Sequence, residues 1–251
     1  MTVGASRSVA FTVDLEPDCP PFLSGWRGVE EGMPRLLSLL REERVRATFF
    51  TTGDSARRYP DAVRALLADG HELACHGMSH RAFPDMSRDE ARAEIEESAE
   101  ILRGFAPVTS FRAPYLRFPD TYAELLTASG LTLDSSHAKY KLAYWRSRRS
   151  DASRHDSTLT RVPASMTSSV LRLPRVVRHL ILDALSSPVV LFVHPWEFVD
   201  LTHEHLRYDC RFRTGEPALA CVREVLQRFA TRGSRWITMR ELDPRATHVA
   251  A

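Results

Sequence analysis

Short apolar runs rich in β-forming residues alternate along the chain with longer segments of helical periodicity. Strands are predicted at residues 9–13, 47–52, 71–75, 109–112, 131–134, 159–163, 189–193 and 235–238. Helices are predicted at residues 32–43, 59–68, 88–104, 120–129, 174–185 and 217–232, and Ser87 with Glu90 forms a capping-box signature before the third of them. Such alternation implies an α/β fold with a parallel sheet or barrel. A length of 251 residues suits one barrel, so we expect a single domain over residues 1–251.

Composition narrows the classes of function. The chain is 43% hydrophobic, which suffices for a sizeable core. Its 34 basic and 32 acidic residues give a net charge of +2, and this balance argues against nucleic acid as the main partner, because phosphate binding normally requires a basic excess. The four cysteines, at positions 19, 75, 210 and 221, have no zinc-binding spacing, and we expect them to be reduced.

No segment of the sequence predicts a membrane span or a secretion signal. No run approaches the roughly 20 apolar residues that a spanning helix needs, and the N-terminus lacks the pattern of a signal peptide. We therefore expect a soluble, cytoplasmic protein. The segment Leu171–Leu185 is basic and amphipathic; we expect a barrel helix there, with a weak membrane-surface contact as the alternative. The charged segment Lys139–Asp156 is predicted to be a long loop.

Residues able to carry chemistry follow the predicted strands one after another. Asp14, His76, Arg112, Asp134 and His194 each fall at or just after the end of a strand. In α/β barrels the carboxyl ends of the strands meet at one face, where the variable loops converge. The sequence therefore predicts an active site at this face.

The string HGMSH places His76 and His80 four residues apart. A helix or a tight loop would bring both imidazoles together, and Gly77 would permit the sharp exit from the strand that this requires. Neutral imidazole suits zinc, cobalt, nickel or iron(II). The alternative is two surface histidines. His71, at the start of the same strand, is predicted to be structural.

Asp14 and Glu16 end the first apolar run. Residues two apart in a strand point to the same side, so one carboxylate can ligate a metal while the other remains free as a base. Asp18 is a third candidate ligand, although Pro17 interrupts the alternation before it. The alternative is an acidic loop.

Two more segments supply candidate groups. His194 follows the dry strand VVLFV, where burial lowers and a nearby carboxylate raises an imidazole pKa, so this residue can serve as an acid. Trp196 could form a stacking wall for a sugar. In the string FRAPY, Arg112 could clamp the carboxylate of Asp14, and the backbone N–H of Tyr115 could face a developing oxyanion.

The strings TVDLE, HGMSH, FRAPY, LDSS and LFVHPWE occur in this order, and together they resemble the motifs of the NodB-type polysaccharide deacetylase family. The resemblance runs from about Val9 to His194, and the order of helices and strands continues it to the end of the chain. It implies a distorted (β/α) barrel that binds one divalent metal ion and hydrolyses the amide of an N-acylated amino sugar.

The resemblance also implies roles for individual residues. Asp14 would be the general base, His76 and His80 metal ligands, Arg112 the residue that holds the base, and His194 the acid. Asp134 would pair with His194 and tune it. Many members of the family carry a second aspartate directly after the first, as a metal ligand. Leu15 stands there in this chain, so Glu16 is the expected third ligand, with Asp14 and Asp18 as alternatives.

The sequence thus predicts a metal-dependent hydrolase that removes an acetyl or formyl group from the nitrogen of an amino sugar. Zinc is the expected ion, with cobalt, nickel and iron as alternatives. The expected substrate is an N-acylated amino sugar or a lipid-linked sugar. A cyclic-amide or ureide hydrolase on the same scaffold and a catalytically inactive sugar-binding barrel are the competing predictions. The oligomeric state stays open.

Overall fold

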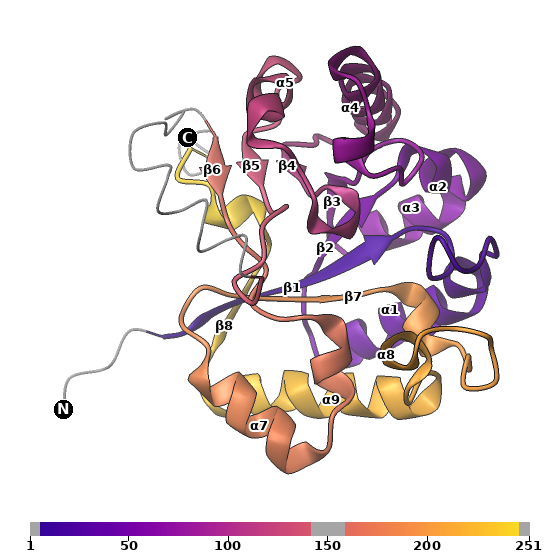
Figure 1. Cartoon of the computed structure of the whole chain (residues 1–251). Helices are drawn as coiled ribbons and strands as arrows, with labels where there is room; N and C mark the ends of the chain where they lie inside the picture. Colours follow the sequence, from indigo (N-terminus) through magenta and orange to yellow (C-terminus); the bar gives the residue numbers. More distant parts are fainter. Residues whose placement is uncertain (1–5, 142–158, 246–251) are drawn as a thin grey trace.

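The computed structural model describes residues 6–141 and 159–245. Within them a sheet of parallel strands has the order β6-β5-β4-β3-β2-β1-β7, and β8 pairs with the beginning of β1 (Figure 1). β1 is the longest strand; its end pairs with β2, and its other edge pairs with β7. The strands are β1 (Ser8–Leu15), β2 (Thr48–Thr51), β3 (Glu72–Cys75), β4 (Ser110–Phe111), β5 (Leu133–Asp134), β6 (Thr160–Arg161), β7 (Val189–Val193) and β8 (Arg235–Ile237).

Helices surround this sheet, with α4 and α5 at one side and α7 and α9 at the opposite side in Figure 1. The helices are α1 (Met33–Glu42), α2 (Gly53–Arg58), α3 (Pro60–Ala68), α4 (Arg88–Arg103), α5 (Ala123–Ala128), α7 (Arg175–Ala184), α8 (Tyr208–Arg211) and α9 (Glu216–Thr231). Single turns include η1 (Gly28–Gly32), η2 (Phe83–Asp85), η3 (Pro114–Leu116), η4 (Asp120–Tyr122), η5 (Ser168–Arg172), η6 (Pro195–Phe198) and η7 (Arg240–Leu242).

Most of these elements match the prediction from the sequence. The capping box of Ser87 and Glu90 at the start of α4 is confirmed. The helices α2 and α8 were not predicted, because six and four residues are too few for a helical period to show. Of the predicted loop Lys139–Asp156, residues 142 onward lie outside the described residues.

The sheet curls until its two edge regions meet. Just after β6, the backbone N–H of Ser165 donates to the carbonyl of Val190 in β7 at 2.9 Å. The backbone N–H of Val190 in turn donates to the hydroxyl of Ser165 at 2.9 Å. This exchange joins the segment after one edge strand to the other edge strand, so the predicted distorted barrel is confirmed.

Alternate residues of β1 belong to two different cores. Val9, Phe11 and Val13 pack with leucines of α1 and α9 outside the barrel. Ala10 packs inside the barrel with apolar residues of β2, β3 and β7. Since side chains alternate along a strand, the even-numbered residues at the end of β1, Asp14 among them, also enter the barrel.

The basic residues predicted to form one face of Leu171–Leu185 are not all exposed. The side chains of Arg172 and Arg178 are buried, and each contacts a carboxylate, Glu197 and Glu224 respectively. Val176 and Leu180 of α7 are instead exposed. The charge pattern of a sequence cannot show whether an arginine is exposed or is buried beside a carboxylate. Arg172 and Arg178 therefore differ from the amphipathic interpretation.

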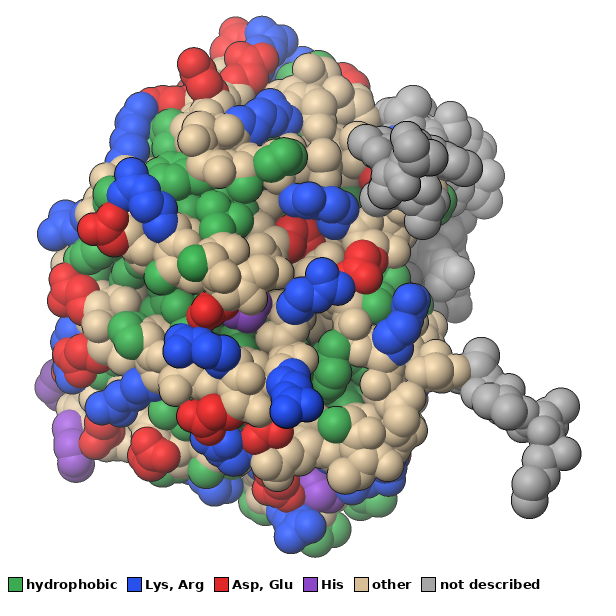
Figure 2. Space-filling model, turned by 180° about the vertical axis from the view of Figure 1, so that it is seen from behind, with side chains coloured by type: hydrophobic (Ala, Val, Ile, Leu, Met, Phe, Trp, Pro, Cys, Tyr) green, Lys and Arg blue, Asp and Glu red, His purple; other side chains and the backbone are tan. Residues whose placement is uncertain are grey.

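The surface carries both signs of charge close together. Figure 2, which shows the face behind that of Figure 1, has acidic, basic and hydrophobic side chains interspersed. Many exposed charges form pairs, such as Arg223 with Glu42 at 2.8 Å, and such pairs contribute little to stability. Among the described residues, no helix has the length and hydrophobicity to cross a membrane.

His71 is structural, as predicted. Its Nδ1 accepts a hydrogen bond from the backbone N–H of Ala47 at 3.1 Å, which requires the neutral ring. Burial lowers the pKa of His71 to about 4. In the unfolded chain this pKa is near 6.5, so the unfolded state binds the proton first as the pH falls.

We therefore expect the contribution of His71 to the free energy of unfolding to be complete above about pH 6.5. As the pH falls to about 4, this contribution, about 3 kcal/mol, should be lost. His71→Gln, which keeps an acceptor but does not titrate, should lose less stability between pH 7.5 and pH 4.5. Urea unfolding of both proteins at the two pH values measures the difference. Identical pH dependence would contradict this assignment.

Candidate active site

A cavity of about 310 Å³ opens at the carboxyl ends of the strands. Its wall contains most of the residues singled out from the sequence: Asp14, Glu16, His76, His80, Tyr115, His194 and Trp196. Arg112 and Asp134 are the two predicted site residues that do not line it. The four cysteines are free, as predicted, and Cys19 and Cys210 also line the cavity.

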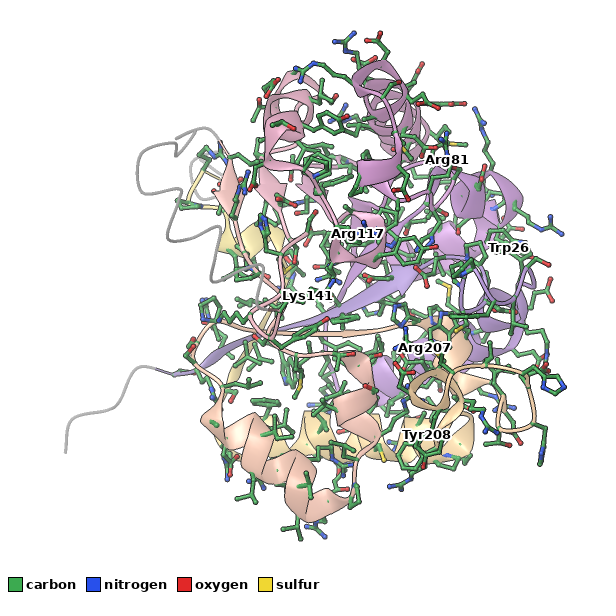
Figure 3. All side chains as sticks on the ribbon, viewed as in Figure 1. Trp26, Arg81, Arg117, Lys141, Arg207 and Tyr208 are labelled. Atoms are coloured by element: carbon green, nitrogen blue, oxygen red, sulfur yellow. The ribbon has the colours of Figure 1, made fainter. Side chains whose placement is uncertain are left out.

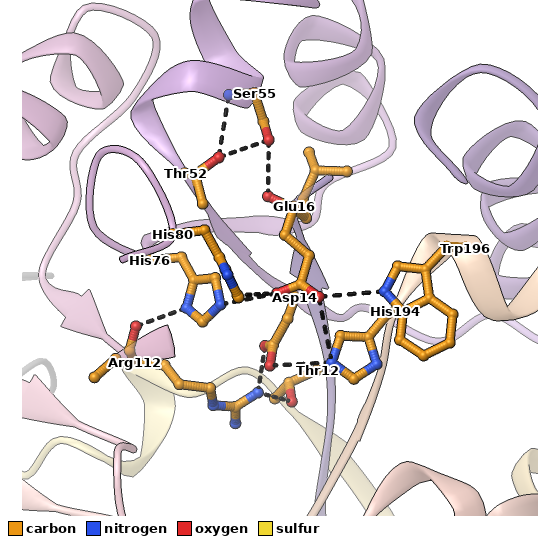
Figure 4. A network of polar contacts seen from close by, with 12 residues as sticks. Thr12, Asp14, Glu16, Thr52, Ser55, His76, His80, Arg112, His194 and Trp196 are labelled. Atoms are coloured by element: carbon orange, nitrogen blue, oxygen red, sulfur yellow. Dashed lines mark hydrogen bonds and ion pairs between the residues drawn. The ribbon is translucent and has the colours of Figure 1, made fainter. Parts of the chain in front are cut away.

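Glu16, His76 and His80 converge in this cavity (Figure 4). One potential ligand atom from each residue lies within 4.8 Å of the other two. The Glu16 Oε2 atom is 3.3 Å from His76 Nε2 and 2.5 Å from His80 Nε2. Burial alone would raise the pKa of Glu16, but the neighbouring imidazoles of His80, His194 and His76 hold it well below its usual range. The three groups thus form an anionic, buried donor set.

The hydrogen bonding of the two histidines fits a metal ion. His76 Nδ1–H donates to the carbonyl of Arg112 at 2.7 Å, so in the neutral ring Nε2 carries the lone pair. That lone pair faces the Glu16 carboxylate, an arrangement that a cation between them would make favourable. His80 Nδ1 is buried without a hydrogen-bond partner in the described residues, and its Nε2 also faces Glu16. Two imidazoles and a carboxylate match the ligand preferences of zinc.

The loop that carries the histidines is held from two sides. Gly77 and His80 both have left-handed backbone conformations, with φ of 76° and 60°, so a turn rather than a helix brings the rings together. The Glu94 carboxylate on α4 accepts the backbone N–H groups of Met78 at 2.8 Å and Ser79 at 3.0 Å. The amide of Gly53, at the start of α2, donates to the Gly77 carbonyl at 3.0 Å.

Asp14 is held by Arg112, as predicted. The Arg112 guanidinium group is fully buried in the barrel and donates from Nη1 to Asp14 Oδ1 at 2.6 Å. It also donates to the hydroxyls of Thr12 at 2.8 Å and Ser135 at 3.0 Å. The other Asp14 oxygen, Oδ2, lies 4.0 Å from His194 Nε2 (Figure 4). Asp14 therefore keeps one carboxylate oxygen on the cavity side.

His194 is oriented by Glu197. The Glu197 Oε1 atom accepts both the backbone N–H of His194, at 2.9 Å, and its Nδ1–H, at 2.8 Å. Burial works to lower the pKa of His194, but the charge of Glu16 and the contact with Glu197 outweigh it and raise the pKa to about 9. Behind Glu197 lies Arg172, at 3.0 Å. His194 therefore presents a proton on Nε2, which lies 3.8 Å from Glu16 Oε1.

Trp196 joins the acid to the ligand set. Its indole ring stacks on His194 with a centroid distance of 4.8 Å, and its Nε1–H donates to Glu16 Oε1 at 3.2 Å. One face of the indole is therefore covered by His194. Trp196 lines the cavity as expected, but it orients protein groups rather than offering an open stacking wall on that face.

The prediction that Asp134 pairs with His194 is wrong. Asp134 Oδ1 accepts the backbone N–H of Ser136 at 2.8 Å, and Oδ2 has no hydrogen-bond partner in the described residues. The pairing role falls to Glu197, because η6 places this residue one turn after His194. Asp18, the alternative ligand, is also excluded from the cluster, since its two oxygens accept the backbone N–H groups of Arg27 and Gly28.

The supporting roles of Glu197, Arg172 and Glu94 were not predicted from the sequence. A signal existed for Glu197, because a glutamate three residues after a histidine that precedes proline can close a capping box. No signal in one sequence identifies Glu94 or Arg172, whose partners are distant along the chain. Tyr115 is placed as expected at the cavity, and its backbone N–H has no acceptor in the described residues.

Comparison with known proteins agrees with this arrangement. A family model described as polysaccharide deacetylase matches residues 3–133, just over half of the chain. The peptidoglycan-N-acetylglucosamine deacetylase of Bacillus cereus is 34% identical over 110 residues, which are 43% of this chain and 36% of that protein. The chain spans about half or less of the length of the curated relatives that it matches.

Solved structures share the fold. A family 4 carbohydrate esterase from Streptomyces lividans, in complex with acetate, superposes with a TM-score of 0.62 at 19% identity, covering 93% of this chain and 94% of that one. BA3943 from Bacillus anthracis, described as a CE4 family pseudoenzyme, gives a TM-score of 0.64 at 14% identity, covering 95% and 66%. These identities establish the fold alone. The match of the family model over more than half of the sequence establishes descent, and the chain belongs to the polysaccharide deacetylase family.

Proposed function

We propose that this protein is a divalent-metal-dependent hydrolase that removes an acyl group, acetyl or formyl, from the nitrogen of an N-acylated amino sugar. One observation carries the proposal: the Glu16, His76 and His80 cluster lies in the same cavity as Asp14 and His194. The names of relatives support the substrate class, since the matched proteins include a chitooligosaccharide deacetylase from Bradyrhizobium that is 34% identical over 119 residues. A lipid-linked amino sugar is the alternative substrate.

Glu16, His76 and His80 would hold the metal, for which we propose zinc. When bound, such an ion polarises an amide carbonyl and makes water acidic enough to attack near neutral pH. The hydrogen bond from His76 to the Arg112 carbonyl and the contacts of Glu94 fix the geometry of this site. Ligands that are already oriented by such hydrogen bonds lose less conformational freedom when they bind a metal ion.

Asp14 acts as the base in this proposal. Its Oδ1 accepts from Arg112, which fixes the orientation of the carboxylate, and its Oδ2 takes the proton from the attacking water. The backbone N–H of Tyr115 is available to the oxyanion that forms on the former carbonyl oxygen.

His194 acts as the acid. Its Nδ1 is fixed by Glu197, so the Nε2 proton is directed at the cavity, where it passes to the leaving amine as the carbon–nitrogen bond breaks. The raised pKa of His194 supports this role because the ring is then protonated before the reaction. Asp14 and His194 thus divide the two proton transfers between them.

Two alternatives use the same cavity. A cyclic-amide or ureide hydrolase would need the same ligand set and acid. Only the substrate that it hydrolyses would distinguish it from an N-deacylase. A catalytically inactive barrel would resemble BA3943, a pseudoenzyme with this fold. The intact set of base, ligands and acid in this chain favours the active enzyme.

The metal site leads to the first functional prediction. His76→Ala removes one of three ligands, and we expect the purified variant to lose the ion while the wild type keeps about one per chain. Elemental mass spectrometry after dialysis measures the content. His205→Ala, at an exposed position, is the control and should keep the metal. A chelator should abolish acyl release by the wild type, and metal retained by His76→Ala would contradict the ligand assignment.

Asp14→Asn separates the base from the ligands. We expect kcat to fall about 10²–10⁴-fold with metal content unchanged, because the amide cannot accept the proton. Release of acetate or formate from a panel of N-acyl amino sugars measures this. Thr12→Val, which removes another acceptor of the same arginine, should lower kcat far less. Normal turnover by Asp14→Asn would exclude this residue as the base.

Glu197→Gln tests which carboxylate supports the acid. The neutral amide weakens the contact with His194, and we expect kcat to fall roughly 10-fold or more while the metal is retained. Asp134→Asn is the matched comparison and should stay near wild type, since Asn keeps the acceptor for Ser136. A larger loss for Asp134→Asn than for Glu197→Gln would reinstate the sequence-based pairing.

A further inference from the structure

A second hollow lies beside the candidate active site. It has a volume of about 380 Å³, and Leu116 lines both this hollow and the cavity that holds the metal ligands. Leu116, the last residue of the turn η3 (Pro114–Leu116), therefore forms part of the partition between them. A substrate longer than one sugar, with its acyl group at the metal ligands, could place its next group in this hollow.

The walls of the hollow are mainly apolar, with charged groups at a few points. Leu116, Phe118 and Pro119 form part of the apolar wall, while Arg117 and Lys141 supply cationic groups. Ligand sites in proteins commonly have this composition, in which apolar surfaces give contact area and a few polar groups give specificity.

Positive charge in this hollow exceeds the negative charge available to it. Asp120 is the only carboxylate among its described lining residues, and it already pairs with Arg161 and lies 3.6 Å from His137 Nε2. Arg117 is exposed, and its guanidinium group has no hydrogen bond or ion pair in the described residues. The hollow therefore keeps an uncompensated guanidinium group.

Lys141 adds a second positive charge close to the first. Its Nζ donates to the carbonyls of Tyr115, at 2.8 Å, and Leu116, at 3.3 Å, so its charge is hydrogen-bonded but not neutralised. Burial and the charge of Arg117 lower the pKa of Lys141. Two cations held this close repel each other, and an anion between them would relieve the repulsion.

Two other arginines, Arg207 and Arg81, already have carboxylate partners. Arg207 lines the cavity, but it pairs with both oxygens of Asp209, at 3.1 and 3.0 Å. Arg81 pairs with Glu90 at 3.2 Å. Figure 3 shows Arg117 and Lys141 near each other, with Arg207 apart from them. The available charge is thus concentrated at one side of the site.

We propose that the hollow at Arg117 and Lys141 is a subsite for an anionic group, a phosphate or a carboxylate, carried by the amino-sugar substrate. An ammonium and a guanidinium group suit either anion, since both offer several N–H donors. This inference rests on the proposed function and narrows it, because it selects charged amino sugars over neutral oligomers.

The test compares binding and turnover of three sugars by the metal-loaded protein. The sugars are N-acetylglucosamine, its 1-phosphate, and N-acetylmuramic acid, which carries a carboxylate. Arg117→Gln should bind at least one of the two anionic sugars about 10- to 100-fold more weakly, as expected for the loss of a charged hydrogen bond, and should bind the neutral sugar as the wild type does. The sugar that loses affinity identifies the anion.

Arg64→Gln is the matched control, because it removes the same charge from an exposed arginine on α3. It should leave all three affinities unchanged. Calorimetric titration gives the affinities whether or not acyl release occurs, so failure of all three sugars to react would count against the proposed function and not against the subsite. Unchanged affinity of Arg117→Gln for both anionic sugars, or an equal loss for the neutral one, would overturn the subsite.

Discussion

The ion pair between Arg112 and Asp14 inside the barrel is the interaction on which the site depends. A fully buried guanidinium group is costly unless it is well paired. Here Asp14, Thr12 and Ser135 accept from the two terminal nitrogens of Arg112, the Phe50 ring lies 4.1 Å away, and only Nε has no hydrogen-bond partner in the described residues. Removing one partner of such a pair costs about 3–5 kcal/mol, because the other charge remains buried. The same arginine offers its backbone carbonyl to His76. One residue of the chain thus fixes both the base and a metal ligand, and the stability of the barrel is coupled to the geometry of the site.

Charge is shared across the rest of the site in a similar way. Glu16 receives contacts from His76, His80 and Trp196, and its charge is also a main cause of the raised pKa of His194. A metal ion bound to Glu16 would partly neutralise its charge, and Glu16 would then raise the pKa of His194 less. Glu197, backed by Arg172, supplies a second negative charge that does not depend on the ligand cluster. The acid therefore keeps a carboxylate partner of its own, whatever occupies the ligands.

The sequence predicts those parts of this site whose positions are set by residues close together along the chain. The two-residue period of β1 places Asp14 and Glu16 together at the cavity, and it turns Leu15 towards the outer core. Pairing between distant residues is different. Whether His194 meets Asp134 or Glu197 depends on a single turn of η6, and whether Arg172 faces solvent or Glu197 depends on how η5 packs. Neither leaves a periodic signal, so the sequence predicts the candidate groups but not their partners.

The turn η3 is where chemistry and recognition meet. Tyr115 and Leu116 both have left-handed backbone conformations, with φ of 59° and 51°, which are unfavourable for residues other than glycine. Lys141 holds the carbonyls of both residues, and Arg117 follows directly. Tyr115, whose backbone N–H is proposed for the oxyanion, and Arg117, whose guanidinium group is proposed for the anion, are therefore separated by one residue of a braced turn. Because the backbone fixes where the exposed Arg117 side chain begins, selection among charged sugars would depend on the distance between the acyl nitrogen and the anion as well as on charge.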